Sequence, residues 1–116
     1  MDAPTIPDRT AWLQGQLLAI LPDTVAILAA EPRVIGIKDS AGDPDTFMRF
    51  LSTKGRHPQF RVLLGDGTLM VTERLLPDDG LVPGPANIVP HLYVALHKAR
   101  VAGDMTTWRR AWSCLR

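Results

Sequence analysis

The sequence predicts an α/β fold in which parallel strands alternate with helices. The run Val34–Ile37 is rich in β-branched residues and has almost no apolar–polar alternation, which is typical of a parallel strand buried on both faces. Apolar runs at 60–64 and 81–83 follow, each separated from the previous one by helix-start signals. This order of strand and helix, repeated along the chain, indicates parallel pairing with right-handed crossovers.

The helices are predicted from their end signals. Pro22 and Asp23 favour a helix start, because proline suits the first turn and a carboxylate meets the positive end of the helix dipole. Asp43 marks a further start, and Gly103 an end. The expected elements are a loop at 1–10, a helix at 12–20, a helix at 24–30, a strand at 34–38, a helix from 43–45 onward, a strand at 60–64, a helix at 68–76, a strand at 81–83, a helix at 87–100 and a helix at 105–115.

Composition and charge exclude several classes of protein. Hydrophobic residues make up 46% and charged residues 22%, close to globular averages. The net charge is +1 without a basic run, so we expect no nucleic-acid partner. No apolar stretch approaches the roughly 18 residues of a membrane span, so we expect no membrane partner. The single Cys114 and the absence of a secretion signal in residues 1–20 favour the cytoplasm.

Lys38 is the first candidate for chemistry, because it lies at the polar end of the first apolar run. Strand ends of this kind form the rim at which α/β sheets and barrels carry ligands. An amine held beside an apolar wall loses part of its proton affinity, and a neutral amine can attack a carbonyl group. The residues alone leave a second interpretation open, in which Lys38 points into water or pairs with Asp39.

A metal site has little support in the sequence. His57, His91 and His97 have no metal-ligand spacing with one another or with Cys114. The aspartates at positions 39, 43 and 45 could surround a magnesium ion, but helix capping explains them more simply. We therefore expect neither a metal nor any other cofactor.

The segment VIGIKDSAGD at 34–43 resembles the Schiff-base segment of the dihydrodipicolinate synthase and N-acetylneuraminate lyase family, the class I pyruvate-dependent aldolases. Further similar segments follow in the same order and at similar spacing: RVLLGDG at 61–67, DGLVPG at 79–84 and ANIVP at 86–90. The match covers about residues 21–104. The ordered set is specific, although no single segment is.

The resemblance implies a partial TIM (β/α)8 barrel, comprising about the last three βα units plus C-terminal helices. A complete barrel needs roughly 250 residues, whereas this chain has 116. The domains expected are a poorly matched N-terminal arm and short helix at 1–20, the partial barrel at 21–104 and a C-terminal helix at 105–116. Such a barrel leaves strand edges unpaired and interior side chains such as Val34, Val62 and Leu64 uncovered. Self-association, partner binding or poor solubility is therefore expected.

The resemblance also implies a chemistry. Lys38 would form a Schiff base with pyruvate or a related 2-oxo acid, and a carbon–carbon bond would then form or break at the neighbouring carbon. Gly65 and Val82 would bind substrate by shaping the pocket with their backbone groups. The residues leave an equal alternative for Gly65, which is that it and Gly67 only supply a tight turn with positive φ.

Several parts of the family site have no counterpart in this sequence. The Gly-Thr-Thr-Gly-Glu-like loop that holds the keto-acid carboxylate is missing, and Pro4 stands where the family has its proton-relay tyrosine. Arg9 stays unassigned, and Tyr93 is better explained by packing. One hypothesis is a truncated lyase or aldolase, weakly active or inactive alone, that works as a homo-oligomer or with a partner completing the barrel. The alternative is a catalytically incompetent fragment, serving as an interaction domain or persisting as a gene remnant.

Overall fold

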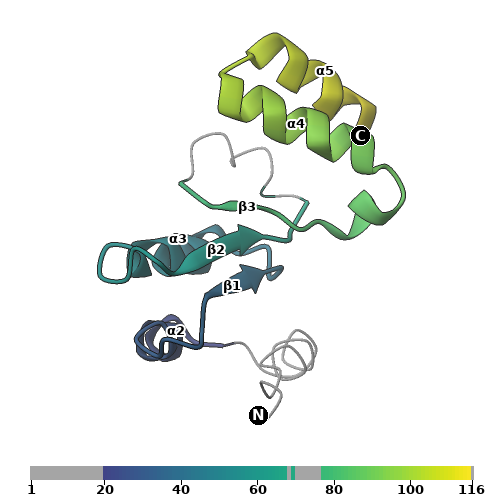
Figure 1. Ribbon diagram of the computed structural model, residues 1–116. Helices are drawn as coiled ribbons and strands as arrows, with labels where there is room; N and C mark the ends of the chain where they lie inside the picture. The colour runs from purple at the N-terminus through teal and green to yellow at the C-terminus, as the bar shows by residue number, and fades with distance from the viewer. Residues whose placement is uncertain (1–19, 68, 70–76, 116) are drawn as a thin grey trace, which may run out of the picture.

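The computed structural model describes residues 20–67, 69 and 77–115. Its centre is a three-stranded parallel sheet in the order β1 (Gly36–Asp39), β2 (Arg61–Leu64) and β3 (Gly80–Leu81) (Figure 1). The other elements are α2 (Pro22–Leu28), α3 (Pro44–Thr53), the 3-10 helix η3 (Gly84–Asn87), α4 (Pro90–Ala102) and α5 (Met105–Leu115). The α/β class and the parallel pairing are confirmed.

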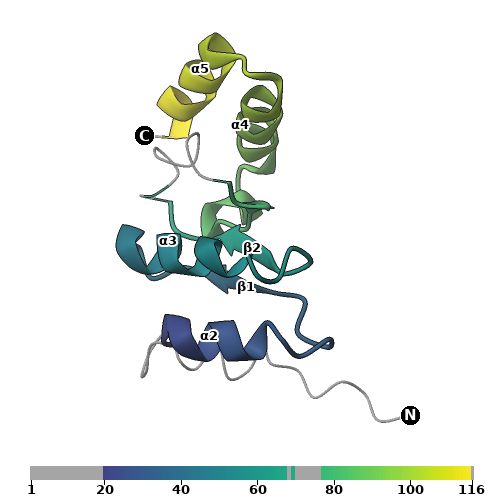
Figure 2. The same ribbon diagram turned by 90° about the vertical axis from the view of Figure 1, so that its left-hand side faces the viewer.

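The register of the sheet decides which side chains face the helices. Lys38 of β1 is the partner of Leu63 in β2, and Leu63 is in turn the partner of Gly80 in β3. Successive side chains point to opposite faces of a strand, so Val62 and Leu64 point the other way from Leu63. Both belong to the hydrophobic core that also contains Phe47 and Phe50 of α3. In Figure 2, α3 lies in front of β1 and β2 and covers that face.

Two expectations about burial are therefore wrong. Val62 and Leu64 are fully buried against the helices and do not line an uncovered barrel interior, and Val34 also packs against the core. The first strand is not buried on both faces, since Ile35 is 76% exposed and Lys38 is exposed. An unbroken apolar run gives no information about which alternate residues face the helices, and this ambiguity caused both errors.

Helices α2 and α3 follow the expected start signals. The Asp43 carboxylate accepts hydrogen bonds from the backbone N–H groups of Asp45 and Thr46, both at 3.3 Å, and Pro44 occupies the first turn. On α3, Phe47, Phe50 and Leu51 share the buried face. Helix α2 begins at Pro22 and ends at Leu28, slightly earlier than expected.

The helix expected over 87–100 is wrong at its start. Residues 84–87 form η3, and α4 begins only at Pro90. Proline has no N–H for a helix interior but suits the first turn, so a continuous helix through position 90 is disfavoured. The expected end is confirmed: Gly103 has φ 69° and its N–H bonds the carbonyl oxygen of Arg100 at 3.0 Å. The left-handed φ favours glycine at this position.

Helices α4 and α5 lie side by side in both views and form a second layer beside the sheet (Figures 1 and 2). Tyr93, Leu96 and Ala99 of α4 are buried with Trp108 and Ala111 of α5. The Trp108 and Trp112 rings stack with their centroids 5.8 Å apart. The packing explanation for Tyr93 is confirmed, because only 8% of it is exposed.

Other expectations fall partly or wholly outside the described residues. The loop at 1–10, the helix at 68–76 and almost all of the helix at 12–20 cannot be compared. The first strand runs over 36–39 instead of 34–38, and the third is only two residues long. Over the ranges that the structure covers, no helix combines the length and the apolar character that crossing a membrane requires.

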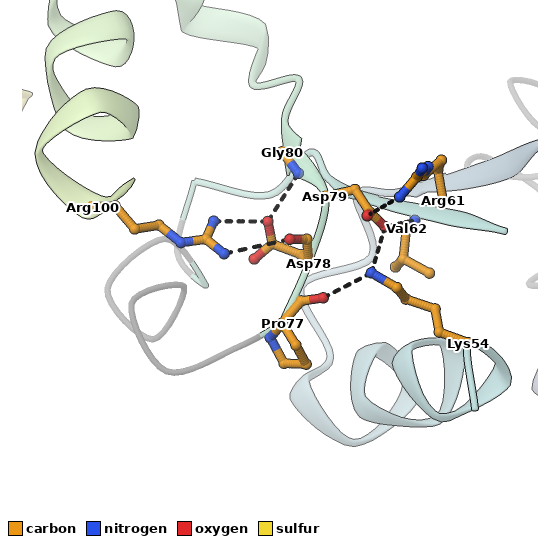
Figure 3. Close-up of polar contacts among 8 residues, drawn as sticks. All are labelled: Lys54, Arg61, Val62, Pro77, Asp78, Asp79, Gly80 and Arg100. Carbon is orange, nitrogen blue, oxygen red and sulfur yellow. Dashed lines mark hydrogen bonds and ion pairs between the residues drawn. The ribbon is translucent and has the colours of Figure 1, made fainter. Parts of the chain in front are cut away.

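Two adjacent aspartates join the third strand to the rest of the domain (Figure 3). The Asp79 carboxylate bonds Lys54 Nζ at 2.8 Å, Arg61 Nη1 at 3.0 Å and the Val62 N–H at 2.8 Å. The Asp78 side chain is fully buried and bonds Arg100 Nη1 of α4 at 2.8 Å. Asp79 therefore links β3 to β2 and α3, while Asp78 links it to α4.

The surroundings shift the pKa values of the two carboxyl groups in opposite directions. Burial raises the pKa of Asp78, and the bonds from Arg100 and from the Gly80 N–H only partly offset this effect. Burial also raises the pKa of Asp79, but the bonds from Lys54, Val62 and Arg61 together outweigh it and hold that pKa below its usual value. The charged form of Asp79 is thus the form that stabilises the fold.

We predict that Asp79→Asn lowers the free energy of unfolding by about 2 kcal/mol at pH 7, because hydrogen bonds to a charged group are lost. A lowered folded-state pKa contributes stability above the unfolded value of about 3.9, and this stability disappears as the pH falls through the folded value. The difference between the two proteins should therefore shrink below about pH 4 in urea denaturation series. Asp23→Asn, at an exposed ion pair, is the control and should have no resolvable effect. A constant difference at all pH values would contradict the role of the charge.

Candidate active site on the open face of the sheet

Lys38 lies near the carboxyl end of β1, on the face of the sheet opposite α3. We call this face, which carries Lys38, Leu63 and Val82, the open face. The Lys38 side chain is exposed, and the described part of the chain offers its amine no hydrogen-bond or ion-pair partner. The expected position of Lys38 at a strand end is confirmed.

Pairing of Lys38 with Asp39 does not occur, because the two side chains point to opposite faces. Asp39 is only 7% exposed, and one of its oxygens accepts the Ala41 N–H at 3.0 Å. Its other oxygen is buried without a hydrogen-bond partner among the described residues. Burial raises the pKa of Asp39, and the nearby Asp66 and Asp43 carboxylates add to that rise.

Gly65 directly follows β2 and lies against the Lys38 side chain. A Cβ atom at position 65 would overlap both Lys38 Cε and Ser40 Oγ, and would lie 3.1 Å from the Asp39 carbonyl oxygen. Positive φ does not explain this glycine, since among the described glycines only 42, 80 and 103 have one. The turn interpretation of Gly65 and Gly67 is therefore wrong. Gly65 instead provides the space that the Lys38 side chain occupies.

The backbone N–H groups beside Lys38 are already used by the sheet. The Gly65 N–H bonds the Asp39 carbonyl at 2.7 Å, and the Val82 N–H bonds the Leu64 carbonyl at 2.8 Å. These bonds align the ends of the three strands at one edge. Gly65 and Val82 thus lie at the expected strand ends, but their N–H groups are not directed at a ligand.

A shallow groove of about 430 Å³ runs along the open face from Lys38 toward the beginning of β2. Its walls are mostly apolar. Of its two cationic residues, Arg61 is bound to Asp79 at 3.0 Å. The residues that line it are Ile35, Gly36, Ile37, Lys38, Arg61, Leu63 and Asp79.

No metal centre forms in the part of the chain that the structure describes, since no group of three or more His, Cys, Asp or Glu side chains could hold an ion there. Asp43 caps α3, in agreement with the simpler explanation for the loop aspartates.

Sequence reasoning missed two neighbours of Lys38. Ser40 shares with it the space above Gly65, and Leu63 is its strand partner. The register would have identified Leu63, but the position of Ser40 depends on the turn after β1 and has no sequence signal. Pro4 and Arg9 lie outside the described residues.

The sequence matches the Dihydrodipicolinate synthetase family over residues 5–112. The chain belongs to this family. The match extends on both sides of the 21–104 region that carries the resemblance, while the division into domains stays a prediction.

Curated relatives and a solved structure agree with this membership. The 4-hydroxy-tetrahydrodipicolinate synthase of Hyphomonas neptunium is 33% identical over 104 residues, covering 90% of this chain and 33% of the relative. That of Methanoculleus marisnigri is also 33% identical, covering 86% and 32%. The dihydrodipicolinate synthase structure from Bacteroides thetaiotaomicron aligns with a TM-score of 0.75 and 33% identity, covering 85% of this chain and 33% of that chain.

The chain therefore spans about a third of the length of the relatives it matches. Its small parallel sheet and flanking helices agree with one part of the larger dihydrodipicolinate synthase structure. The expectation of a partial barrel is confirmed.

We predict that Gly65→Ala displaces the Lys38 side chain with only a modest loss of stability, about 1 to 2 kcal/mol, because two of the three crowded atoms are movable side-chain ends. The lysines would be labelled by reductive ¹³C-methylation, and the Lys38 signal, assigned with Lys38→Arg, should shift in the NMR spectrum. Gly67→Ala is the matched control, since its Cβ would meet nothing within 4 Å. Equal spectra for both variants would contradict the contact between Gly65 and Lys38.

Proposed function

We propose that this chain supplies the Schiff-base lysine of a lyase or aldolase that acts on pyruvate or a related 2-oxo acid. The neutral Lys38 amine adds to the keto carbon and gives a carbinolamine. A proton taken up from solvent by the carbinolamine hydroxyl lets it leave as water, and the nitrogen lone pair then forms the protonated imine between Lys38 and that carbon. The imine accepts the electron pair released when a bond at the neighbouring carbon breaks, and the reverse flow of electrons forms that bond.

The position of Lys38 is the single observation that carries the proposal. Its amine emerges at the carboxyl edge of a parallel sheet, which is where barrel enzymes carry their catalytic groups. The side chain lies over Gly65, and no described residue engages the amine in an ion pair. A lysine held this way is accessible to a small carbonyl compound from the open face.

The described residues offer few groups that could bind the substrate carboxylate or transfer protons during the reaction. The N–H groups of Gly65 and Val82 are committed to the sheet, and Arg61 is committed to Asp79. The substrate carboxylate therefore has no dedicated partner among the described groups beside Lys38. Acid–base catalysis usually contributes factors of roughly 100 to 10,000. We infer that imine formation is within reach of this chain, but that turnover is slow or absent without further groups.

A second candidate function is a non-catalytic interaction domain. The exposed open face and the lack of a described acid–base group beside Lys38 favour it. A test for imine formation distinguishes the two candidate functions, because a domain that only binds other proteins has no need for a reactive lysine.

We predict that pyruvate plus borohydride leaves a reduced adduct on Lys38, because borohydride reduces the imine to a stable secondary amine. Peptide mass mapping would locate the adduct. Lys38→Ala should abolish it, whereas Lys98→Ala, which removes an exposed lysine of α4, should retain it. Failure to label Lys38 at millimolar pyruvate, or equal labelling of Lys38 and Lys98, would reject the catalytic proposal and favour the interaction domain.

A further inference from the structure

A second cleft lies between helices α2 and α3, and Lys38 does not line it. The two helices are neighbours in Figure 2, and Arg49 Nη2 of α3 is 3.3 Å from Asp23 Oδ1 of α2. The cleft encloses about 400 Å³, which is within the range of pockets that hold small molecules. The proposed Schiff-base chemistry uses none of its residues and therefore does not explain it.

Basic side chains dominate the lining of this cleft. Arg49, Arg56 and His57 come from α3 and the loop that follows it, whereas Asp23 is the one acidic residue among the described residues that line the cleft. The side chains of Arg49 and Asp23 are 60% and 91% exposed. An ion pair between such exposed side chains is weak, so the Arg49 guanidinium can also bind a second anion. The excess of basic groups favours an anionic ligand.

The Arg56 and His57 side chains have no structural task among the described residues. No described carboxylate forms an ion pair with either of them. They are also not needed to cap α3, because backbone N–H groups already occupy its last carbonyl groups. The Thr53 carbonyl accepts the N–H of Arg56 at 3.1 Å and that of His57 at 3.0 Å, and the Ser52 carbonyl accepts the Gly55 N–H at 3.1 Å. Both side chains are therefore available to a ligand.

We propose that this cleft binds the phosphoryl group of a small phosphate ester. A carboxylate has two oxygens in one plane, which a single guanidinium can satisfy, whereas a phosphoryl group has three strong acceptor oxygens that several side chains can share. Arg49, Arg56 and His57 supply these donors. On the α2 side the cleft is lined by Pro22 and Ala26, and this apolar wall suits the carbon part of an ester better than a free phosphate ion.

Titration of the full 116-residue chain, labelled with ¹⁵N, tests the ligand class. The probes are glycerol phosphate, inorganic phosphate and citrate, at one ionic strength maintained with sodium chloride so that general screening stays constant. We expect saturable shifts of the Arg56 and His57 amide signals, with glycerol phosphate binding more tightly than inorganic phosphate. Tighter binding of inorganic phosphate would keep the phosphoryl site and assign it to the free ion. Tighter binding of citrate, or no saturation at millimolar concentrations, would overturn the proposal.

Three variants test the position of the site. Arg56→Gln should weaken the binding of glycerol phosphate about fivefold or more, because a charged donor is lost. Arg109→Gln is the matched control, since it removes the same charge from an exposed position on α5 and should leave the binding unchanged. Asp23→Asn removes the acidic residue of the cleft and should tighten the binding about threefold. A merely damaged fold would not produce such a gain.

Equal weakening by Arg56→Gln and Arg109→Gln would show binding to general surface charge and overturn the proposal. Unchanged or weaker binding by Asp23→Asn would do the same. Thermal unfolding of each variant checks that the fold is retained. Lys38→Ala should bind glycerol phosphate as the unaltered chain does, so the cleft and the Schiff-base chemistry are tested independently.

Discussion

The parallel register between β1 and β2 is the constraint on which the rest of the structure depends. Because Lys38 is the partner of Leu63, both side chains emerge on the open face, while Val62 and Leu64 close the core on the other. A shift of one residue in either strand would exchange these sets and place a lysine among the helix-facing apolar side chains. The same register brings Gly65 against the lysine, so one feature of the sheet fixes the core, the candidate nucleophile and the space it occupies.

The third strand is short, and hydrogen bonds between strands alone would hold it weakly. Asp78 and Asp79 compensate with one buried link to α4 and several links to β2 and α3. These links fix the start of β3, and the bond from the Val82 N–H to Leu64 fixes its end. Asp79 also restrains Arg61 at the far end of the groove. Among the described residues that line the groove, Lys38 is therefore the basic side chain without an ion-pair partner, and it is the one assigned to the proposed chemistry.

Local chemistry made much of the fold predictable. Asp43, Pro44 and Gly103 mark helix ends through backbone effects that need no tertiary context, and the structure agrees with them. The orientation of the strands is not predictable in the same way, because an unbroken apolar run looks alike in either register. The expectation that Val62 and Leu64 are uncovered is wrong for this reason. Lys38 could be found because it ends such a run. Ser40 could not, because its approach to Gly65 arises only when two loops distant in sequence meet.

Competitive acylation of the lysines, followed by mass spectrometry, tests the central claim most directly, namely that the Lys38 amine projects from the open face of the sheet and is available to a carbonyl compound. The rate of labelling would be compared for Lys38 and for Lys98 of α4, in the untreated chain and after treatment with pyruvate plus borohydride. The account predicts rapid labelling of both amines in the untreated chain and selective loss of Lys38 labelling after the treatment. Lys38 already protected in the untreated chain, or blocked no more than Lys98 by the treatment, would contradict it.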